Sequence, residues 1–294
     1  MAGRGIRLGS VRPGRNQPGA AENLILEEGL RQKETLLAEK LAALGSTLVA
    51  YSGGVDSAYL AWAARQALGD RMLAVLADSP SLAEFQKRDA IRFAADYGIP
   101  LEVIRTEEFE NAEYTKNAPD RCFHCKDELF GKLDAMARER GFVSIIYGVN
   151  ADDTRDFRPG HRAAAQYGVR SPLLEAGLNK AEIRELARQA GLPVWDRPAS
   201  ACLSSRIPYG TPVTIQNLKK VEDGEDALRK LGFRQFRVRH HGELVRIEIA
   251  PDELSKTLDP QMAQRFTEIF KKLGYKYVTL DLEGYRTGSL NEVL

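Results

Sequence analysis

The sequence predicts an α/β protein in which a doubly wound parallel sheet is followed by a smaller C-terminal α+β domain. Short apolar runs alternate with longer amphipathic segments up to residue 190, and this alternation is typical of parallel strands joined by helices. Beyond residue 212 the order changes to helix, two strands, helix and strand. A chain of 294 residues is also longer than most single α/β domains, which favours two domains.

The elements of the first part follow one another regularly. Leucines spaced among charged residues over 22–44 predict an amphipathic helix on the outside of a sheet. A buried strand over 47–51, a turn over 52–57 and a helix over 58–68, ended by Gly69, come next. The later ranges are strands 72–77, 101–105 and 144–147, helices 82–97, 126–138 and 180–190, and a further short strand over 172–174.

The loop-like stretch over 193–212 separates the two parts of the chain. Beyond it we expect helices over 215–231 and 261–273, and strands over 235–240, 243–249 and 276–282. We therefore divide the chain into a flexible basic tail (1–20), an α/β domain (21–205) and an α+β domain (206–294). The tail has four arginines and no acidic residue, and its many glycines disfavour an amphipathic helix.

Composition excludes several classes of protein. Lys and Arg total 42 and Asp and Glu total 41, so no overall charge attracts polyanions and nucleic-acid binding is disfavoured. No apolar stretch approaches the about 18 residues of a membrane span, and no apolar signal region follows the basic start. We expect a cytoplasmic protein that has no membrane partner. Three cysteines argue against a disulfide framework and for free thiols, metal binding or catalysis.

A phosphate-binding turn is predicted after the first strand. Two glycines let backbone amides approach an anion, and the helix that follows contributes partial positive charge at its N-terminus. No Lys follows the glycines, so this is not a Walker loop. A carboxylate in this place would repel phosphate unless a cation lies between them, so we assign Asp56 to Mg²⁺; an ordinary turn with Asp56 as helix cap is the simpler interpretation. The nucleotide-binding residues expected here are Ser52, Gly53, Gly54, Val55, Asp56 and Ser57.

The SGGVDS turn resembles the PP-loop of the N-type ATP pyrophosphatases, which cleave ATP between the α and β phosphates. Asp78 and Gly148, each directly after a further expected strand, are counted with the nucleotide-binding residues. Other segments together resemble the LarE family of ATP-dependent sulfur transferases, from residue 30 to 294. These segments are PDRCFHCK (119–126), GVNADD (148–153), DFRPG (156–160), ASACLSSRIPYG (199–210) and RVR (237–239).

The resemblance implies a small-molecule nucleotide substrate, pyridinium-3,5-biscarboxylic acid mononucleotide. Its carboxylates would be adenylylated, with release of pyrophosphate, and converted to thiocarboxylates with release of AMP. Adenylylation serves this exchange because a carboxylate oxygen is a poor leaving group and AMP departs readily. The family also forms homo-oligomers, and residues 206–294 become the domain for substrate binding or oligomerisation.

Three cysteines are the candidates for sulfur delivery. Cys122 and Cys125 form a CxxC at the start of a helix, and Cys202 lies in the loop between the domains. Three thiolates can hold a 4Fe-4S cluster and leave one iron free to bind an extra sulfide, which is the arrangement we favour. In some LarE members, one cysteine instead gives up its own sulfur. That position aligns with Ala201, one place before Cys202, and loss of sulfur from Cys202 is the rival interpretation. Zinc held by the cysteines with His124, or thiols that are simply inert, would also account for these residues.

Arginines of the second domain are the candidates for gripping the substrate. Side chains alternate along a strand, so Arg237 and Arg239 share the outward side of 235–240, as Glu248 does on the next strand. Guanidinium groups suit a phosphate monoester, and the resemblance assigns them to the nucleotide phosphate. The resemblance further implies that Glu225 and Glu248 bind divalent metal near the substrate. It places Arg206 and Lys126 in the reaction pocket. Without the resemblance, a solvated charged face is the better interpretation.

Two rival functions remain open. A tRNA thiolase shares the PP-loop and the chemistry, but it needs a broad positive surface that this nearly neutral chain lacks. A nucleotide-binding module without turnover belongs to a different class, and pyrophosphate release distinguishes it from an enzyme. The sulfur source, as free sulfide or a sulfur-delivery protein, is a further expected partner.

Overall fold

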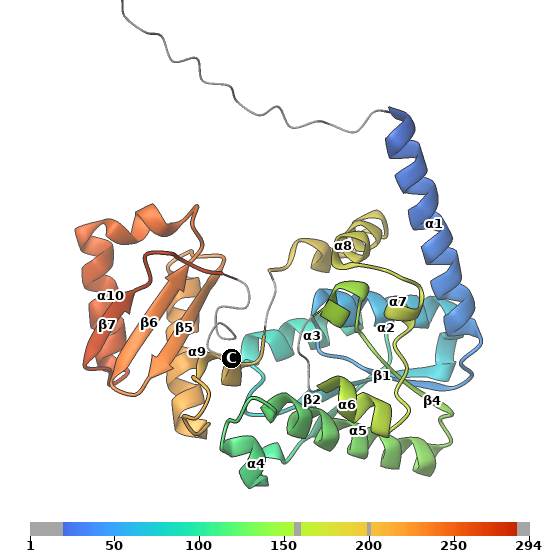
Figure 1. The fold of residues 1–294 in the computed structure, drawn as a ribbon, viewed down its shortest axis with the longest axis horizontal. Coiled ribbons are helices and arrows are strands. Elements are labelled where there is room, and N and C mark those ends of the chain that lie inside the picture. Colours follow the sequence, from blue (N-terminus) through green and yellow to red (C-terminus); the bar gives the residue numbers. More distant parts are fainter. Residues whose placement is uncertain (1–19, 156–159, 199–200, 287–294) are drawn as a thin grey trace, which may run out of the picture.

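The computed structural model describes residues 20–155, 160–198 and 201–286, shown in Figure 1. The predicted basic tail lies outside these residues, except for its last position. Most of the DFRPG segment and two residues of the ASACLSSRIPYG segment also lie outside them.

The first sheet confirms the predicted parallel architecture. Its strands are β1 (Thr47–Ala50), β2 (Met72–Asp78), β3 (Leu101–Arg105) and β4 (Ser144–Tyr147). Their order is β3-β2-β1-β4, and every neighbouring pair is parallel. The central strand β1 therefore delivers the chain directly into the predicted phosphate-binding turn, at the carboxyl ends of its neighbours.

Helices cover both faces of this sheet (Figure 1). Val49, Ala74 and Leu76 enter one core together with α1, α2, α3, α7 and α8. Leu48 and Val75, whose side chains point the opposite way, enter a second core with α5 and α6. The bounds are α1 (Ala20–Ala42), α2 (Val55–Leu68), α3 (Glu84–Asp96), α4 (Ala112–Thr115), α5 (Arg121–Arg140), α6 (Gly160–Gln166), α7 (Pro172–Glu175) and α8 (Lys180–Gln189).

The strand predicted over 172–174 is wrong, because these residues form the short helix α7. Pro172 occupies the first turn, where its missing N–H costs nothing, and the same residue would remove a donor from a sheet. Leu173 is fully buried in the first core. Arg170, just before the helix, makes an isolated parallel bridge to Ile146 of β4.

The second domain has the predicted order of elements. It contains α9 (Ile215–Lys230), β5 (Phe236–His241), β6 (Leu244–Ile249), α10 (Pro260–Lys272) and β7 (Tyr277–Leu280). β5 and β6 are antiparallel, β6 and β7 are parallel, and β6 lies in the middle. Short 3-10 helices lie at Gly69–Arg71, Glu108–Glu110, Ala151–Arg155, Pro193–Asp196, Leu203–Arg206 and Leu254–Leu258.

Residues 203–213 run from one sheet to the other along α4 and the start of α5. Leu203 donates its amide to Ser81 (2.8 Å), and Val213 donates to Thr115 (2.8 Å). The first sheet has a hydrophobic core on each face, and the second sheet packs on a third core. We retain residues 205 and 206 as the proposed domain boundary. None of the helices in the described part of the chain combines the length and the apolar character of a membrane span.

Candidate active site

The turn between β1 and α2 has the geometry of an anion cradle. Gly53 has φ +73°, and a Cβ there would lie 2.6 Å from the Cβ of Ala90, so glycine is required. The Ser52 and Ser57 hydroxyls are 3.0 Å apart, and both lie on this turn. α2 begins at Val55, earlier than predicted, so Ser57 belongs to its first turn. The helix N-terminus therefore faces whatever binds above the glycines.

Gly148 fits the end of β4 against the start of α2. A Cβ on Gly148 would lie 2.8 Å from the backbone N of Ser57 and 2.9 Å from its Cα. Neither atom belongs to a flexible side chain, so only glycine permits this approach. The close contact brings the segment after Gly148, including Asn150, beside the phosphate turn.

Asp56 has one engaged and one unengaged carboxylate oxygen. Its Oδ2 accepts hydrogen bonds from Lys180 Nζ (2.8 Å) and Asn150 Nδ2 (3.3 Å). Its Oδ1 is buried and has no hydrogen-bond partner. An unpartnered anionic oxygen beside a phosphate cradle fits a divalent cation. Lys180 was missed by sequence reasoning; its position at the first residue of a helix after a capping Asn was the available signal.

Two further polar residues surround the turn. Arg197 donates from Nη1 to the Gly53 carbonyl oxygen (3.2 Å), so its cation reaches the cradle from the stretch between the domains. Asp78, at the end of β2, forms an ion pair with Lys87 of α3 (2.6 Å). The Asp78 carboxylate is therefore paired with a residue of α3 in this structure, and the nucleotide-binding role of Asp78 stays a prediction.

The three cysteines approach one another from distant parts of the chain. Cys122 and Cys125 lie in the first turns of α5, and Cys202 directly precedes the 3-10 helix Leu203–Arg206. Cys122 and Cys202 are exposed, and Cys125 is half-buried. Although the Cys122 residue is exposed at the surface, surrounding protein atoms partly desolvate its thiol and raise its pKa; the neighbouring Cys202 adds to this rise, and Arg121 opposes it. The Cys202 thiol is therefore near enough to Cys122 to contribute to the raised pKa of Cys122.

The surroundings of Cys125 are more enclosed. Burial raises its pKa to about 12; Lys126 opposes this rise, and the Glu108 carboxylate adds to it. Glu108 is almost fully buried, and its Oε2 has no hydrogen-bond partner. Sequence reasoning missed Glu108, since a single acidic residue among other acids carries no signal of its burial. Across the described part of the chain, no three His, Cys, Asp or Glu side chains form a group that could hold a metal ion.

Arg206 connects the segment around Cys202 to Glu225 of α9, in the second domain. It is 1% exposed and pairs with Glu225 through Nε–Oε1 (2.8 Å) and Nη2–Oε2 (3.2 Å). Its Nη1 donates to the carbonyl oxygens of Ala201 (3.0 Å) and Cys202 (3.1 Å). Burial alone would raise the pKa of Glu225, but the charge and hydrogen bonds of Arg206 hold it below its usual value.

The charged face of β5 and β6 is buried, so the expectation of an outward, solvated face is wrong. Arg237 and Arg239 are 8% and 5% exposed, and Glu248 is fully buried. Arg239 forms a bidentate pair with Glu248 (both contacts 2.9 Å) and donates to the Ser205 carbonyl oxygen (2.8 Å). Arg237 lies against the ring of Tyr285 (4.7 Å to the centroid). The loop before α9 and the C-terminal segment cover this face, and a pattern of alternating residues cannot reveal such a cover.

Burial and the nearby Arg206 lower the pKa of Arg237 to about 10. Three buried guanidinium groups lie beside two buried carboxylates, so this cluster has one positive charge in excess. The guanidinium groups belong to Arg206, Arg237 and Arg239, and the carboxylates belong to Glu225 and Glu248. The carboxylates expected to bind divalent metal are paired with arginines in this structure.

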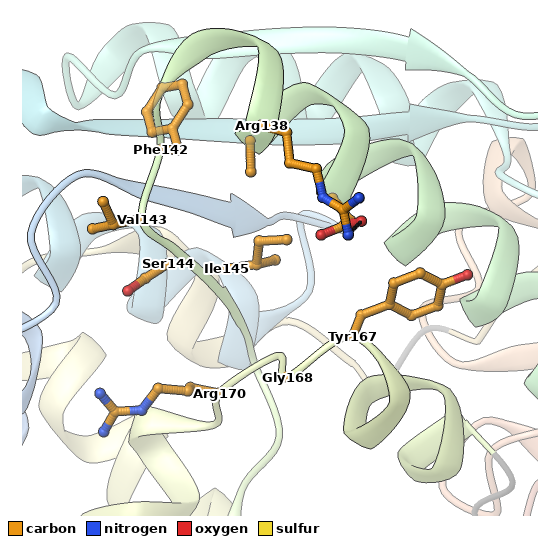
Figure 2. A pocket seen from close by; sticks show the side chains of 10 residues that line it. Arg138, Phe142, Val143, Ser144, Ile145, Tyr167, Gly168 and Arg170 are labelled. Atoms are coloured by element: carbon orange, nitrogen blue, oxygen red, sulfur yellow. Dashed lines mark ion pairs between the residues drawn. The ribbon is translucent and has the colours of Figure 1, made fainter.

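A separate cavity of about 220 Å³ lies away from these residues. Figure 2 shows its lining, which includes Phe142, Val143, Tyr167 and Arg170. It opens at the amino end of β4, whereas the phosphate turn lies at the carboxyl ends of the strands. This cavity contains none of the predicted site residues, and we do not assign the site to it.

The α/β fold, with a glycine turn after its central strand, is matched by one family model. The model of the NAD synthase family matches residues 30–153, which span β1, the turn, and the sheet up to the segment after β4. This match supports the PP-loop α/β fold and indicates an ATP-utilising protein.

Whole-chain relatives define the family. An uncharacterized protein of Synechocystis sp. is 43% identical over 265 residues, covering 90% of this chain and 99% of the relative. The pyridinium-3,5-bisthiocarboxylic acid mononucleotide synthase of Lactiplantibacillus plantarum is 34% identical over 266 residues, covering 90% and 96%. An uncharacterized protein of Methanocaldococcus jannaschii is 31% identical over 240 residues, covering 82% and 90%. The chain therefore belongs to the family of this synthase, the LarE family.

Proposed function

We propose that the protein is an ATP-dependent sulfur transferase that converts the carboxylates of pyridinium-3,5-biscarboxylic acid mononucleotide to thiocarboxylates. One observation carries the proposal: the segment 201–206 contacts the buried arginines on one side and the start of α5, with its two cysteines, on the other. Arg197, a few residues earlier, contacts the phosphate turn. The name of the Lactiplantibacillus plantarum relative supports the choice of substrate.

The first half of the reaction is adenylylation. A substrate carboxylate oxygen attacks the α-phosphorus of ATP, the bond to the β-phosphate breaks, and pyrophosphate leaves. The turn amides at Gly53 and Gly54 and the start of α2 hold the phosphates. Asp56 would hold Mg²⁺ through its unpartnered Oδ1; the bound ion supplies charge that stabilises the phosphate oxygens. Lys180 and Arg197 add fixed positive charge at the same end of the sheet.

Substrate positioning is assigned to the buried arginines. The planar guanidinium groups of Arg237 and Arg239 suit a phosphate monoester, and the local excess of one positive charge favours an anion. Arg239 would exchange part of its contacts with Glu248 and Ser205 for the phosphate. Arg206 links this group to the Cys202 backbone. We propose that the substrate phosphate lies at these arginines while its carboxylate reaches toward Lys126 and the cysteines.

The second half is sulfur transfer. A sulfur nucleophile attacks the carbonyl carbon of the acyl adenylate, the carbon–oxygen bond to AMP breaks, and a thiocarboxylate forms. We propose that Cys122, Cys125 and Cys202 deliver this sulfur. Three thiolates are the number that a 4Fe-4S cluster with one open iron requires, and these three come from two segments, with Arg121 and Lys126 beside them. The cluster would supply a site for an exchangeable sulfide. Side-chain movement is needed, since these thiols do not yet form a metal-binding group in the described structure.

The test uses the purified chain with MgATP, the biscarboxylic acid mononucleotide and sulfide, without oxygen. We expect pyrophosphate release that depends on the acceptor, and mass spectrometry of the substrate should show oxygen replaced by sulfur. Asp56→Asn should abolish both, and Glu185→Gln, on the exposed face of α8, serves as the matched control. Absence of pyrophosphate in the presence of acceptor would rule out the proposal.

The sulfur source needs its own measurement. Anaerobic reconstitution with iron and sulfide, followed by metal and sulfide analysis, should give a coloured protein that loses its cluster when any one cysteine is changed to serine. Mass spectrometry of the intact protein after turnover distinguishes the rival, in which Cys202 loses its own sulfur. A colourless protein with stoichiometric zinc excludes the cluster.

A further inference from the structure

Arg121 occupies an unusual position for a charged residue at the start of a helix. It is 2% exposed, and it directly precedes Cys122. Its Nη1 donates to the Asn117 Oδ1 atom (2.5 Å) and to the Ser204 carbonyl oxygen (2.8 Å). A buried guanidinium group loses its hydration, and this cost is offset only if the group forms hydrogen bonds inside the protein. Here they join the helix that carries Cys122 to the loop that carries Cys202.

Asn117 completes the connection. It is fully buried and has φ +60°, the left-handed conformation, which favours glycine and is seldom adopted by other residues. Its Nδ2 donates to the carbonyl oxygens of Pro208 (2.8 Å) and Thr211 (2.7 Å), and its Oδ1 accepts from Arg121. One side chain therefore fixes both the orientation of Arg121 and the path of the loop after Cys202.

A second set of contacts holds the loop at Ser204 itself. The Ser204 hydroxyl lies 2.6 Å from the Ser81 hydroxyl and 2.9 Å from the Tyr114 hydroxyl, and all three residues are buried. This network holds the Ser204 side chain, whereas Arg121 holds its carbonyl oxygen. The loop is therefore held two residues after Cys202 by Ser81, Tyr114 and Arg121, while Arg206 holds the Cys202 carbonyl oxygen itself.

We propose that Arg121, oriented by Asn117, is a positioning residue that keeps Cys202 beside Cys122 for sulfur delivery. The inference rests on the proposed function for its purpose, but the geometry it describes exists without ATP or substrate. Arg121 does not contact the reacting carbon; it acts by tying two thiol-bearing segments together through Ser204.

A cross-linking measurement tests this positioning without any turnover. In a Cys125→Ser background, only Cys122 and Cys202 remain, and both are exposed. Dibromobimane becomes fluorescent when it joins two thiols, and peptide mass spectrometry identifies the link. Monobromobimane labels single thiols and measures their reactivity alone. The ratio of the cross-linking rate to the labelling rate therefore reports proximity separately from ionisation.

Arg121→Met should lower this ratio at least about tenfold, the factor equivalent to ~1.4 kcal/mol and to one lost hydrogen bond of a charged group. Arg121→Lys keeps the charge, but its ammonium lies one bond nearer the main chain than the Arg121 Nη1 atom, so it should recover part of the ratio. Arg138→Met is the matched control, because Arg138 lies on the same helix with an exposed side chain, and its ratio should equal that of the parent.

Asn117→Gly keeps the left-handed backbone and removes only the side chain, so it tests the same connection if Arg121→Met does not fold. It too should lower the ratio, with the fold checked by circular dichroism. A parental ratio in folded Arg121→Met or in Asn117→Gly overturns the inference. Since no ATP or substrate is present, this result is independent of whether the protein proves to be a sulfur transferase.

Discussion

Removing the charge of Glu225 should destabilise the protein far more than removing a surface carboxylate. Glu225→Gln preserves the size of the side chain but leaves Arg206, which is 1% exposed, without its bidentate partner. Arg237 also lies near enough to Glu225 for its charge to lower the pKa of the carboxyl. The variant therefore leaves buried positive charges uncompensated, and these cannot regain hydration without opening the structure.

The expected loss is about 3–5 kcal/mol in the free energy of unfolding, the usual cost of breaking a buried ion pair. The matched variant Glu185→Gln breaks an exposed pair with Arg188 and should cost less than about 1 kcal/mol, because solvent screens it. The pKa of Glu225 in the folded protein is below its ordinary value of 4.5. Its stabilising contribution is therefore present above that value and is lost as pH falls below it.

Urea unfolding at pH 7, followed by circular dichroism, measures both variants. The double variant Arg206→Met, Glu225→Leu should regain much of the loss, since both charges leave together. If Glu225→Gln proved no more destabilising than Glu185→Gln, the burial and pairing of Arg206 inferred above would be refuted.

Three further outcomes follow from the same geometry. Gly148→Ala should slow pyrophosphate release by about a hundredfold, because its Cβ would displace the Ser57 backbone by roughly an ångström; an unchanged rate would contradict the contact. Lys180→Met removes a positive charge that repels a cation bound at Asp56, so the Mg²⁺ concentration needed for half-maximal release should fall roughly fivefold, or ~1 kcal/mol, in a Mg²⁺ titration. Burial and Lys220 lower the pKa of His240, so stability should fall as pH drops below 6.5, measured by thermal unfolding. His240→Asn should show a smaller fall than the parent, and an equal one would exclude this histidine.

Most of the fold and part of the site were predictable from local pattern. The change from short apolar runs to amphipathic segments predicted the parallel sheet, because burial on both faces demands continuous apolar strands. The prediction of a strand over 172–174 was wrong because three residues are too few to show a hydrophobic period. Pro172 instead begins a short helix, a position that proline favours. Asn150 lies in the GVNADD segment, and the structure adds its contact with Asp56.

The sequence by itself determined that a glycine-containing turn follows the first strand and that the chain has three thiols, because glycine spacing and residue type are local properties that a linear pattern contains. Only the tertiary structure decided that Arg239 is buried against Glu248, that Lys180 reaches Asp56, and that Arg121 joins two cysteine segments. These facts depend on contacts between residues far apart in the chain. Such contacts arise from packing and charge compensation after the elements have formed, and no local period records them.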